Sequence, residues 1–435
     1  MRVDLLYLDL VPSLDMSLAK EENYPLTFKV RRLVISLVFC LIVILLMACK
    51  IIQKDTRDHI IPPADPSTLA NASPGILSPT PLSTLTSSMQ NPTRTSRPFQ
   101  TPQAEIIPSD DTYNVIVGDQ SYNAFPGLGK LDNGTLLIVY RKGKSHAKDK
   151  GIIVLKKSSD GGSTWSTEAS VIDHPTLDLR DPNITLLSDG TLIVNYFEYD
   201  IGARSTIRNG LKVIHSTDDG ETWDKPIEVG TGLFVATSAP ILELPDGDLL
   251  LAYYGNQEGG RYPSAFVIRS ADSGRSWNNK TTIGNGIKDS KPYQEPNLLL
   301  LKSGGILATI RSDGFFPTIH TSTSNDLGKT WAQPSSAFRG SGTPSMLLLK
   351  SGLIITAYRS KIGRNLGLPA LRVSRDSGVT WTPNTEEIII DRYTGPMMYA
   401  SLVQTSDKSI ATVYGMEDGK TRSEIRFRYL LELSE

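Results

Sequence analysis

Residues 158–165 read SSDGGSTW, and variants of this phrase recur along the chain. Every copy follows the pattern S-x-D-x-G-x-S/T-W, and together the copies hold all five tryptophans of the protein. The tryptophans are separated by about 50 to 58 residues, a period that indicates a repeat architecture. The other copies are STDDGETW at 216–223, SADSGRSW at 270–277, SNDLGKTW at 324–331 and SRDSGVTW at 374–381.

A second shared pattern precedes each phrase and predicts two strands joined by a turn. In FPGLGKLDNGTLLIVY, which starts at Phe125, an Asn-Gly turn separates two apolar runs, as in a β-hairpin. Two further short strands per repeat complete a four-stranded unit. Six such units predict an all-β fold, a six-bladed β-propeller over residues 111–435. Further copies of the pattern start at Asp181, Ala239, Glu295, Thr343 and Gly395, and the last has no tryptophan phrase after it.

The repeated phrase is better suited to a structural turn than to an active site. Its acid or serine can bond main-chain amides, its glycine allows positive φ, and its tryptophan can pack between blades. An active site rarely needs five copies of one residue, so we predict that the five phrase aspartates belong to the scaffold. They are Asp160, Asp218, Asp272, Asp326 and Asp376.

Composition excludes several classes of function. The net charge of −1, from 45 basic and 46 acidic side chains, offers no bulk attraction for nucleic acid. Both cysteines lie before residue 50, and the five histidines lack the H-x-x-x-H spacing of a metal site. We therefore expect no metal, no cofactor and no nucleic-acid partner, and a protein that acts as a monomer.

The first 110 residues predict export and tethering to a membrane. Residues 33–48 are apolar and come after basic residues, an order that keeps the N-terminus inside and exports the rest of the chain. Leu46-Met47-Ala48-Cys49 resembles a lipobox, which implies lipid on Cys49; an uncleaved signal anchor is the alternative. Residues 1–50 then form the targeting region, 51–110 a Pro/Ser/Thr-rich disordered linker, and 111–435 a propeller at the extracellular face.

The repeats differ where each first strand begins, just before a shared proline. Repeats two and four place Arg180, Asp181 and Glu295 there, where the others have small or apolar residues. Charged side chains that converge on a concave channel indicate a binding or catalytic site, so these three residues are the first candidates for one.

The phrases resemble the Asp boxes, or BNR repeats, of the sialidase superfamily. QEPNLLLLKSGGILATIRSDG has the order of the sialidase fourth blade, which implies catalysis by Glu295 and a carboxylate-binding role for Arg311. MYASLVQ resembles the sixth-blade nucleophile motif, with Tyr399 as the nucleophile, and Asp149 in KSHAKDKG stands at the acid/base position. A tyrosine activated by glutamate suits a sugar with an anomeric carboxylate, which would repel an anionic nucleophile.

The resemblance also implies a cluster of arginines that binds the substrate carboxylate. Arg364 is the candidate from the fifth blade, and His146 and Asp181 are further candidates for binding substrate. The first-blade arginine of sialidases is missing, because Ala124 occupies its position in NAFPGL. Arg141 or Arg180 would replace it, or the substrate carries no anomeric carboxylate.

The predicted function is that of a membrane-tethered, extracellular exo-α-sialidase that acts on terminal sugars of glycoconjugates. One alternative is a glycosidase of the same fold that acts on another sugar with two carboxylates, Glu295 with Asp181 or Asp149. The other is a carbohydrate-binding propeller without catalysis.

Overall fold

The structure is a computed structural model that describes residues 105–109, 112–147, 149–202, 209–232, 234–392, 397–417 and 422–433. The predicted targeting region, with Cys49, and most of the predicted linker lie outside these ranges. Within them, no helix is long and apolar enough to cross a membrane. Strands dominate the described chain, and the one α-helix there, α2 (Gly286–Asp289), is a single turn.

The described strands form antiparallel meanders in chain order, one for each repeat, as the hairpin pattern predicts. In repeat three the first strand is interrupted, so two short segments pair with the same neighbour. Four of the meanders, those of repeats two to five, are separate sheets. Repeat two contains β7 (Leu177–Leu186), β8 (Leu192–Asp200), β9 (Asn209–Ser216) and β10 (Ile227–Gly232), and repeat three contains β11 (Val235–Ala236), β12 (Leu242–Glu243), β13 (Leu249–Gly255), β14 (Ser264–Ser270) and β15 (Asn278–Gly284). Repeat four contains β16 (Gln294–Leu300), β17 (Ile306–Ser312), β18 (Thr318–Ser324) and β19 (Ser335–Arg339), and repeat five contains β20 (Ser341–Leu348), β21 (Ile354–Arg359), β22 (Pro369–Ser374) and β23 (Ile388–Ile389).

The remaining strands form one nine-stranded sheet, which changes the predicted number of blades. The described strands make five hydrogen-bonded sheets rather than six, because a parallel bridge between Ser423 and Tyr122 joins the last repeat to the first. The outer side of the last repeat is completed by the two N-terminal strands, which both pair with β26. The first of them lies ahead of the predicted boundary at residue 111. The sheet contains β1 (Glu105–Pro108), β2 (Asn114–Val117), β3 (Tyr122–Lys130), β4 (Leu136–Gly143), β5 (Ile152–Ser158), β6 (Ala169–Ile172), β24 (Met397–Gln404), β25 (Ser409–Glu417) and β26 (Ser423–Leu433).

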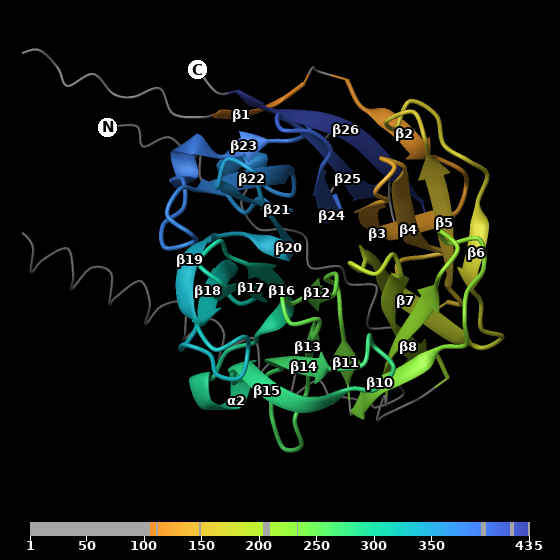
Figure 1. Ribbon diagram of the computed structural model, residues 1–435. Helices are drawn as coiled ribbons and strands as arrows, with labels where there is room; N and C mark the ends of the chain where they lie inside the picture. The colour runs from red at the N-terminus through yellow and green to blue at the C-terminus, as the bar shows by residue number, and fades with distance from the viewer. Residues whose placement is uncertain are drawn as a thin grey trace, which may run out of the picture. The chain divides into compact units, whose positions relative to one another are not determined.

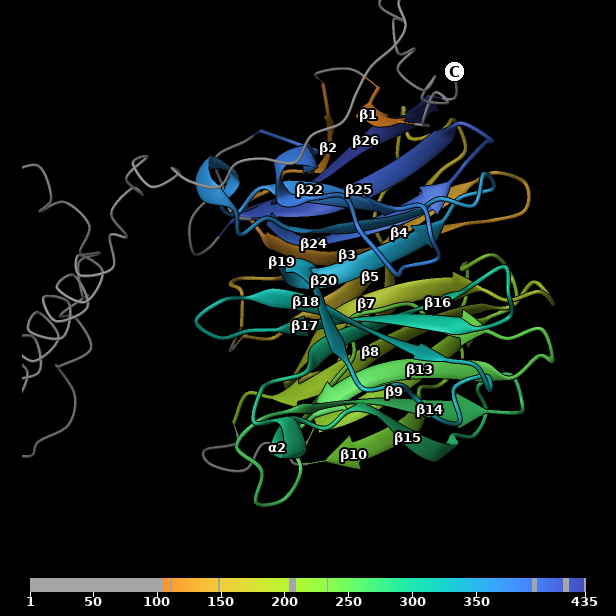
Figure 2. The same ribbon diagram turned by 90° about the vertical axis from the view of Figure 1, so that its left-hand side faces the viewer.

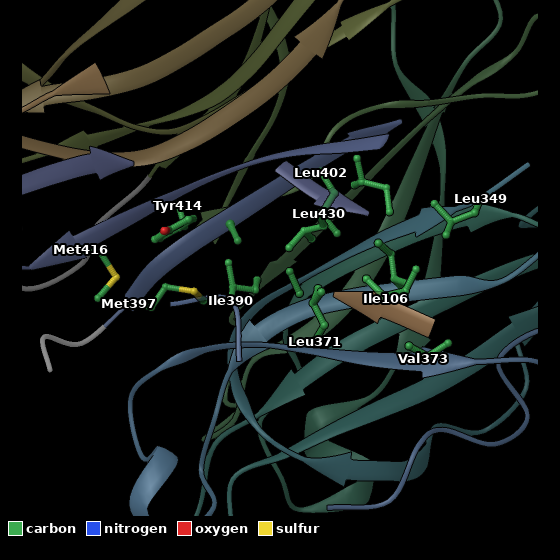
Figure 3. Packing of buried hydrophobic residues seen from close by; sticks show 14 residues of the cluster. Ile106, Leu349, Leu371, Val373, Ile390, Met397, Leu402, Tyr414, Met416 and Leu430 are labelled. Carbon is green, nitrogen blue, oxygen red and sulfur yellow. The ribbon is translucent and has the colours of Figure 1, made fainter. Parts of the chain in front are cut away.

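The sheets are arranged around a central axis in a propeller-like way, with first strands such as β3, β7, β16, β20 and β24 innermost (Figures 1 and 2). Apolar side chains of adjacent sheets fill the space between them. Figure 3 shows one such cluster, in which Ile106 of β1, Leu371 of β22 and Leu430 of β26 pack together.

The Asp-box turns hold neighbouring repeats together, which confirms that their repetition belongs to the scaffold. Trp277, for example, packs against a cluster that contains residues of both the second and the third sheet. The turn glycine lies close to the preceding repeat in every case, where a side chain would meet an apolar or aromatic group. The pairs are Gly162 with Phe427, Gly220 with Leu155, Gly274 with Ile193, Gly328 with Leu250 and Gly378 with Leu307.

Candidate active site

Bulges in the first strands position the residues at the mouth of the channel. The pairing register of β7 with β8 shifts between Arg180 and Asn183, and that of β16 with β17 between Gln294 and Asn297. Asp181 and Glu295 therefore stand at the bulges with φ of 49° and 48°, each just before the shared proline. Positive φ is costly for a residue with a side chain, and such strain is common at functional sites.

A cavity of about 270 Å³ opens at this end of the channel. Its wall combines two cations, one carboxylate, a phenol, an imidazole and an aromatic ring. The lining comes from β3, the loop after β4, and the ends of β17, β21, β24 and β25. The lining residues are Phe125, His146, Arg311, Arg359, Tyr399 and Glu417.

Tyr399 and Glu295 meet although 104 residues separate them in the chain. The Tyr399 hydroxyl donates to Oε1 of Glu295 at 2.7 Å, and Nη1 of Arg311 donates to the same oxygen at 2.7 Å. Thr343 donates to the other carboxylate oxygen at 3.2 Å. The guanidinium of Arg311 also binds both oxygens of Asp313. The structure thus brings together three residues that the resemblance had linked.

Burial controls the protonation of this cluster. Burial, followed by the neighbouring carboxylate of Glu295, raises the pKa of Tyr399 well above its usual value. The phenol is therefore neutral at rest, with a carboxylate already in place to accept its proton. Burial also raises the pKa of Asp181 to about 7, opposed by Arg180 and supported by Glu295. Oδ1 of Asp181 accepts no hydrogen bond from the described residues and lies 4.0 Å from Nε of Arg180.

The fifth-blade arginine on the cavity wall is Arg359, not Arg364. Arg364 is an exposed residue of the 3-10 turn Gly363–Asn365 and is absent from the cavity lining. Arg359 is the last residue of β21 and Arg311 the second-last of β17, and Nε of Arg359 is buried without a partner in the described chain. The repeat pattern contains a signal for this residue, because Arg311 and Arg359 both stand 15 positions after the shared proline.

Asp149 and Arg141 form an ion pair outside the cavity lining. Nη2 of Arg141 donates to Oδ1 of Asp149 at 2.7 Å, and Nε of Arg141 donates to Asp178 at 2.6 Å. The main-chain N–H groups of Lys144 and Ser145 donate to Oδ2 of Asp149. Arg141 is fully buried, so this pair anchors the loop that follows β4. The predicted acid/base role of Asp149 stays a prediction, and its oxygens face this loop.

Arg180 links the same loop to the second sheet. Its Nη1 donates to the carbonyl of His146 at 2.8 Å and to Oδ2 of Asp178 at 3.1 Å. Its guanidinium also lies 5.0 Å from the ring centre of Phe125. Arg180 therefore positions the backbone of a residue that lines the cavity.

His146 reaches the cavity wall from this anchored loop. Its Nδ1 lies 2.8 Å from the Tyr122 hydroxyl and 3.1 Å from Oε1 of Glu417. The Tyr122 hydroxyl also donates to Glu417, the last residue of β25. The sequence offers little signal for Glu417, because the sixth repeat departs from the spacing of the others.

The described residues hold no group of three or more His, Cys, Asp or Glu side chains arranged to bind a metal ion. At the cavity, the groups available for chemistry are the phenol, the carboxylates, the guanidinium groups and the imidazole.

Comparison with known proteins identifies the class of protein. A family model described as a BNR repeat-like domain matches residues 134–414, so the chain belongs to the sialidase and BNR-repeat β-propeller superfamily. A sialidase of Bacteroides fragilis is 24% identical over 322 residues, which cover 63% of this chain and 57% of the relative. A sialidase of Paraclostridium sordellii is 24% identical over 254 residues, or 51% and 59% of the two chains. This chain thus spans less than two thirds of the length of these relatives.

Solved structures share the fold at low sequence identity. A protein of unknown function from Dyadobacter fermentans gives a TM-score of 0.65 at 20% identity, over 75% of this chain and 99% of that one. A Hadza microbial sialidase gives a TM-score of 0.59 at 19% identity, over 71% of this chain and 65% of that one. An α-L-arabinanase of Penicillium chrysogenum gives a TM-score of 0.57 at 16% identity, over 73% of this chain and 97% of that one. Since different activities share this fold, the fold alone does not decide the substrate.

Proposed function

We propose that this protein is a retaining exo-glycosidase of the sialidase type, which removes a terminal acidic sugar from a glycoconjugate. The observation that carries the proposal is the 2.7 Å hydrogen bond from the Tyr399 hydroxyl to Oε1 of Glu295 at the cavity. Glu295 accepts the phenol proton as Tyr399 attacks the anomeric carbon, and the sugar is held as a tyrosyl intermediate until water releases it.

The carboxylate of the sugar would bind to Arg359. Among the described residues, Arg359 forms no ion pair, whereas Arg311 is occupied by Glu295 and Asp313. A guanidinium matches a planar carboxylate with two parallel hydrogen bonds. The cavity of about 270 Å³ is near the lower end of ligand-pocket volumes, which favours one terminal sugar unit over an internal chain segment.

The proposal includes a cellular setting that rests on the sequence alone. An apolar run after basic residues and a Pro/Ser/Thr-rich linker support export and tethering, through lipid on Cys49 or an uncleaved anchor. The protein would then display its propeller at the extracellular face of a membrane. In this proposal the nine-stranded sheet counts as two blades, which makes six.

The proposal is tested with the full chain on a panel of aryl glycosides that includes an aryl α-sialoside. We expect release from the sialoside, and a loss of kcat/KM of roughly 10²–10⁴ in both Glu295→Gln and Tyr399→Phe. Asp272→Asn, in an Asp-box turn, is the matched control and should keep full activity. Hydrolysis of another aryl glycoside, with no hydrolysis of the sialoside, would overturn the choice of substrate.

A second candidate is the same-fold glycosidase with two carboxylates, and the high pKa of Asp181 favours it. Asp181, with a pKa of about 7, interacts electrostatically with Glu295, as the two groups of an acid/base pair would. In that case Asp181→Asn abolishes turnover of a neutral aryl glycoside, and Tyr399→Phe leaves it nearly unchanged. A carbohydrate-binding propeller without catalysis would show sugar binding and no turnover of any substrate.

A further inference from the structure

Departure of the leaving group requires a proton donor whose titratable atom is open to the cavity. Among the described residues near the mouth, Asp149, Asp181, Glu417 and His146 are the candidates. Glu417 lines the cavity, but, despite burial, hydrogen bonds from His146 and Tyr122 hold its pKa below the usual value, so it is a poor proton donor. The oxygens of Asp149 are occupied by Arg141 and by main-chain amides of its own loop. The side chain of Asp181 is only 4% exposed, and neither aspartate lines the cavity.

His146 has the exposure and the orientation that the two aspartates lack. Its side chain is 54% exposed, and it lines the cavity together with Tyr399. The rings of His146 and Tyr399 both pack on Phe125, with centre distances of 5.5 and 5.0 Å. Histidine and nucleophile thus lie on the same aromatic side chain at the cavity wall.

The partners of His146 occupy one of its two ring nitrogens. Tyr122 donates its own proton to Glu417, so Nδ1 of His146 faces two oxygens that can accept its hydrogen. Both contacts use Nδ1, and the described chain places no partner on Nε2. A histidine whose Nδ1–H is held by a carboxylate, with Nε2 open, is arranged for proton transfer.

We propose that His146, oriented by Glu417 and Tyr122, is the general acid and base of this site. The inference rests on the proposed function and names the residue that completes it. Glu417 and Tyr122 act through His146 and are positioning residues.

The proton balance closes over two steps. In the first, the bond from the Tyr399 oxygen to the anomeric carbon forms, and the phenol proton passes to Glu295. The bond to the leaving oxygen breaks, and that oxygen takes the proton from Nε2 of His146. In the second, Nε2 takes a proton from water, whose oxygen bonds to the anomeric carbon as the bond from that carbon to the Tyr399 oxygen breaks, and Glu295 returns its proton to Tyr399.

Charged groups on several elements surround His146. Glu417 from β25 faces its ring, and Arg180 from β7 holds its carbonyl. Asp181, also on β7, and Arg359 of β21 interact electrostatically with His146 and with Glu417, respectively. Burial raises the pKa of Glu417, but hydrogen bonds from His146 and Tyr122 outweigh it, so the pKa lies below the usual value. Glu417 is therefore ionised at neutral pH and can balance an imidazolium.

The test compares two substrates with the same sugar and different leaving groups. The nitrophenolate of a nitrophenyl sialoside leaves without protonation. The lactose of sialyllactose needs a proton on its departing oxygen. For His146→Gln we expect kcat/KM to fall roughly 10²–10⁴-fold on sialyllactose and less than about tenfold on the nitrophenyl sialoside. Azide, which needs no deprotonation, should speed turnover of the nitrophenyl substrate by this variant.

Two further variants separate catalysis from loop structure. Glu417→Gln should show the same selectivity for the leaving group with a smaller loss. Asp149→Asn loosens the loop and should lower kcat/KM on both substrates by one common factor. Melting temperatures identify any variant that fails to fold.

The outcomes distinguish this inference from the proposed function. An equal loss on both substrates in His146→Gln, or no loss, overturns the role of His146 and leaves the proposed function intact. A selective loss in Asp149→Asn would instead assign the proton transfer to Asp149. A wild-type protein that hydrolyses neither sialoside overturns the proposed function, and this inference with it.

Discussion

The aspartates of the Asp-box turns, which form the rim of the sheets, and Asp181 at the mouth of the channel have pKa values shifted in opposite directions. At the rim, Asp218 accepts hydrogen bonds from the hydroxyl and main-chain N–H of Thr222 and from Ser216, which lower its pKa to about 2. At the mouth, burial raises the pKa of Asp181 to about 7, and one of its oxygens has no hydrogen-bond partner in the described chain. A satisfied local turn is typical of scaffold, and an unsatisfied buried acid is typical of function.

The backbone does not show the same contrast. In the Asp-box turns, the residue before the glycine, such as Ser377 at 59°, has positive φ as well as the glycine itself, such as Gly378 at 87°. At the mouth, Phe125, Asp181 and Glu295 have φ between 48° and 58°. Positive φ is costly for a residue with a side chain in both places, so the two regions differ in hydrogen bonding and burial rather than in backbone strain.

The largest expected effect separates an arginine on the cavity wall from one outside it. Arg359→Ala should lower kcat/KM on an acidic sugar roughly 10²–10³-fold, because the half-buried guanidinium on the cavity wall that we propose as the carboxylate ligand is lost. Arg359→Lys should recover only part of this loss, since an ammonium lacks the paired geometry. Arg364→Ala, in the exposed turn, should keep wild-type kinetics; equal losses in both variants would contradict the assignment.

The next effect concerns the stability of the rim. Gly378 and Gly190 share a φ of 87°, but a Cβ at Gly378 would overlap Leu307, and one at Gly190 meets nothing within 4 Å. Gly190→Ala should cost about 1 kcal/mol in backbone strain, and Gly378→Ala about 2–3 kcal/mol because packing is also disturbed. Chemical denaturation measures both values, and equal costs would show that the contact between repeats is unimportant.

The smallest effect is a pH dependence of stability. The folded protein holds a proton on Asp181 that the unfolded chain releases near pH 4, so this acid makes the free energy of unfolding fall as pH rises toward about 7. Asp181→Asn should therefore match the wild type near pH 4 and be the more stable of the two at pH 8, which chemical denaturation at both pH values measures.

The rim provides the control for this measurement. The pKa of Asp218 is lowered to about 2, so the stability that it contributes is present above pH 4 and is lost as pH falls through about 2. Asp218→Asn should then differ from the wild type by a constant amount between pH 5 and 8. A change of that difference with pH would mean that another group is titrating.

Repetition made much of the scaffold predictable. The S-x-D-x-G-x-S/T-W phrase predicted the turns and their non-catalytic acids, and the structure confirms that these turns pack between repeats. Aligning the repeats on the shared proline also located Asp181 and Glu295 at the mouth. The hydrogen bond between Tyr399 and Glu295 could not come from periodicity, because it joins two blades; only the family resemblance linked these residues.

Other site residues depended on contacts that no local pattern contains. Asp149 faces Arg141 instead of the cavity, because a buried guanidinium needs a carboxylate partner. Glu417 reaches His146 from the far end of the chain through ring closure. The parallel bridge between Ser423 and Tyr122 likewise merged two predicted sheets into one.

The sequence by itself determined the strands, the turns and the position of Asp181 and Glu295 at the starts of the first strands, because these depend on spacing along the chain and on local hydrogen bonds. The tertiary structure decided which of those residues share the cavity, which arginine forms no ion pair within the described chain, and which acid has a buried oxygen without a hydrogen-bond partner there. These depend on which side chains meet when residues of separate repeats come together around one axis, and no periodic pattern encodes such pairings.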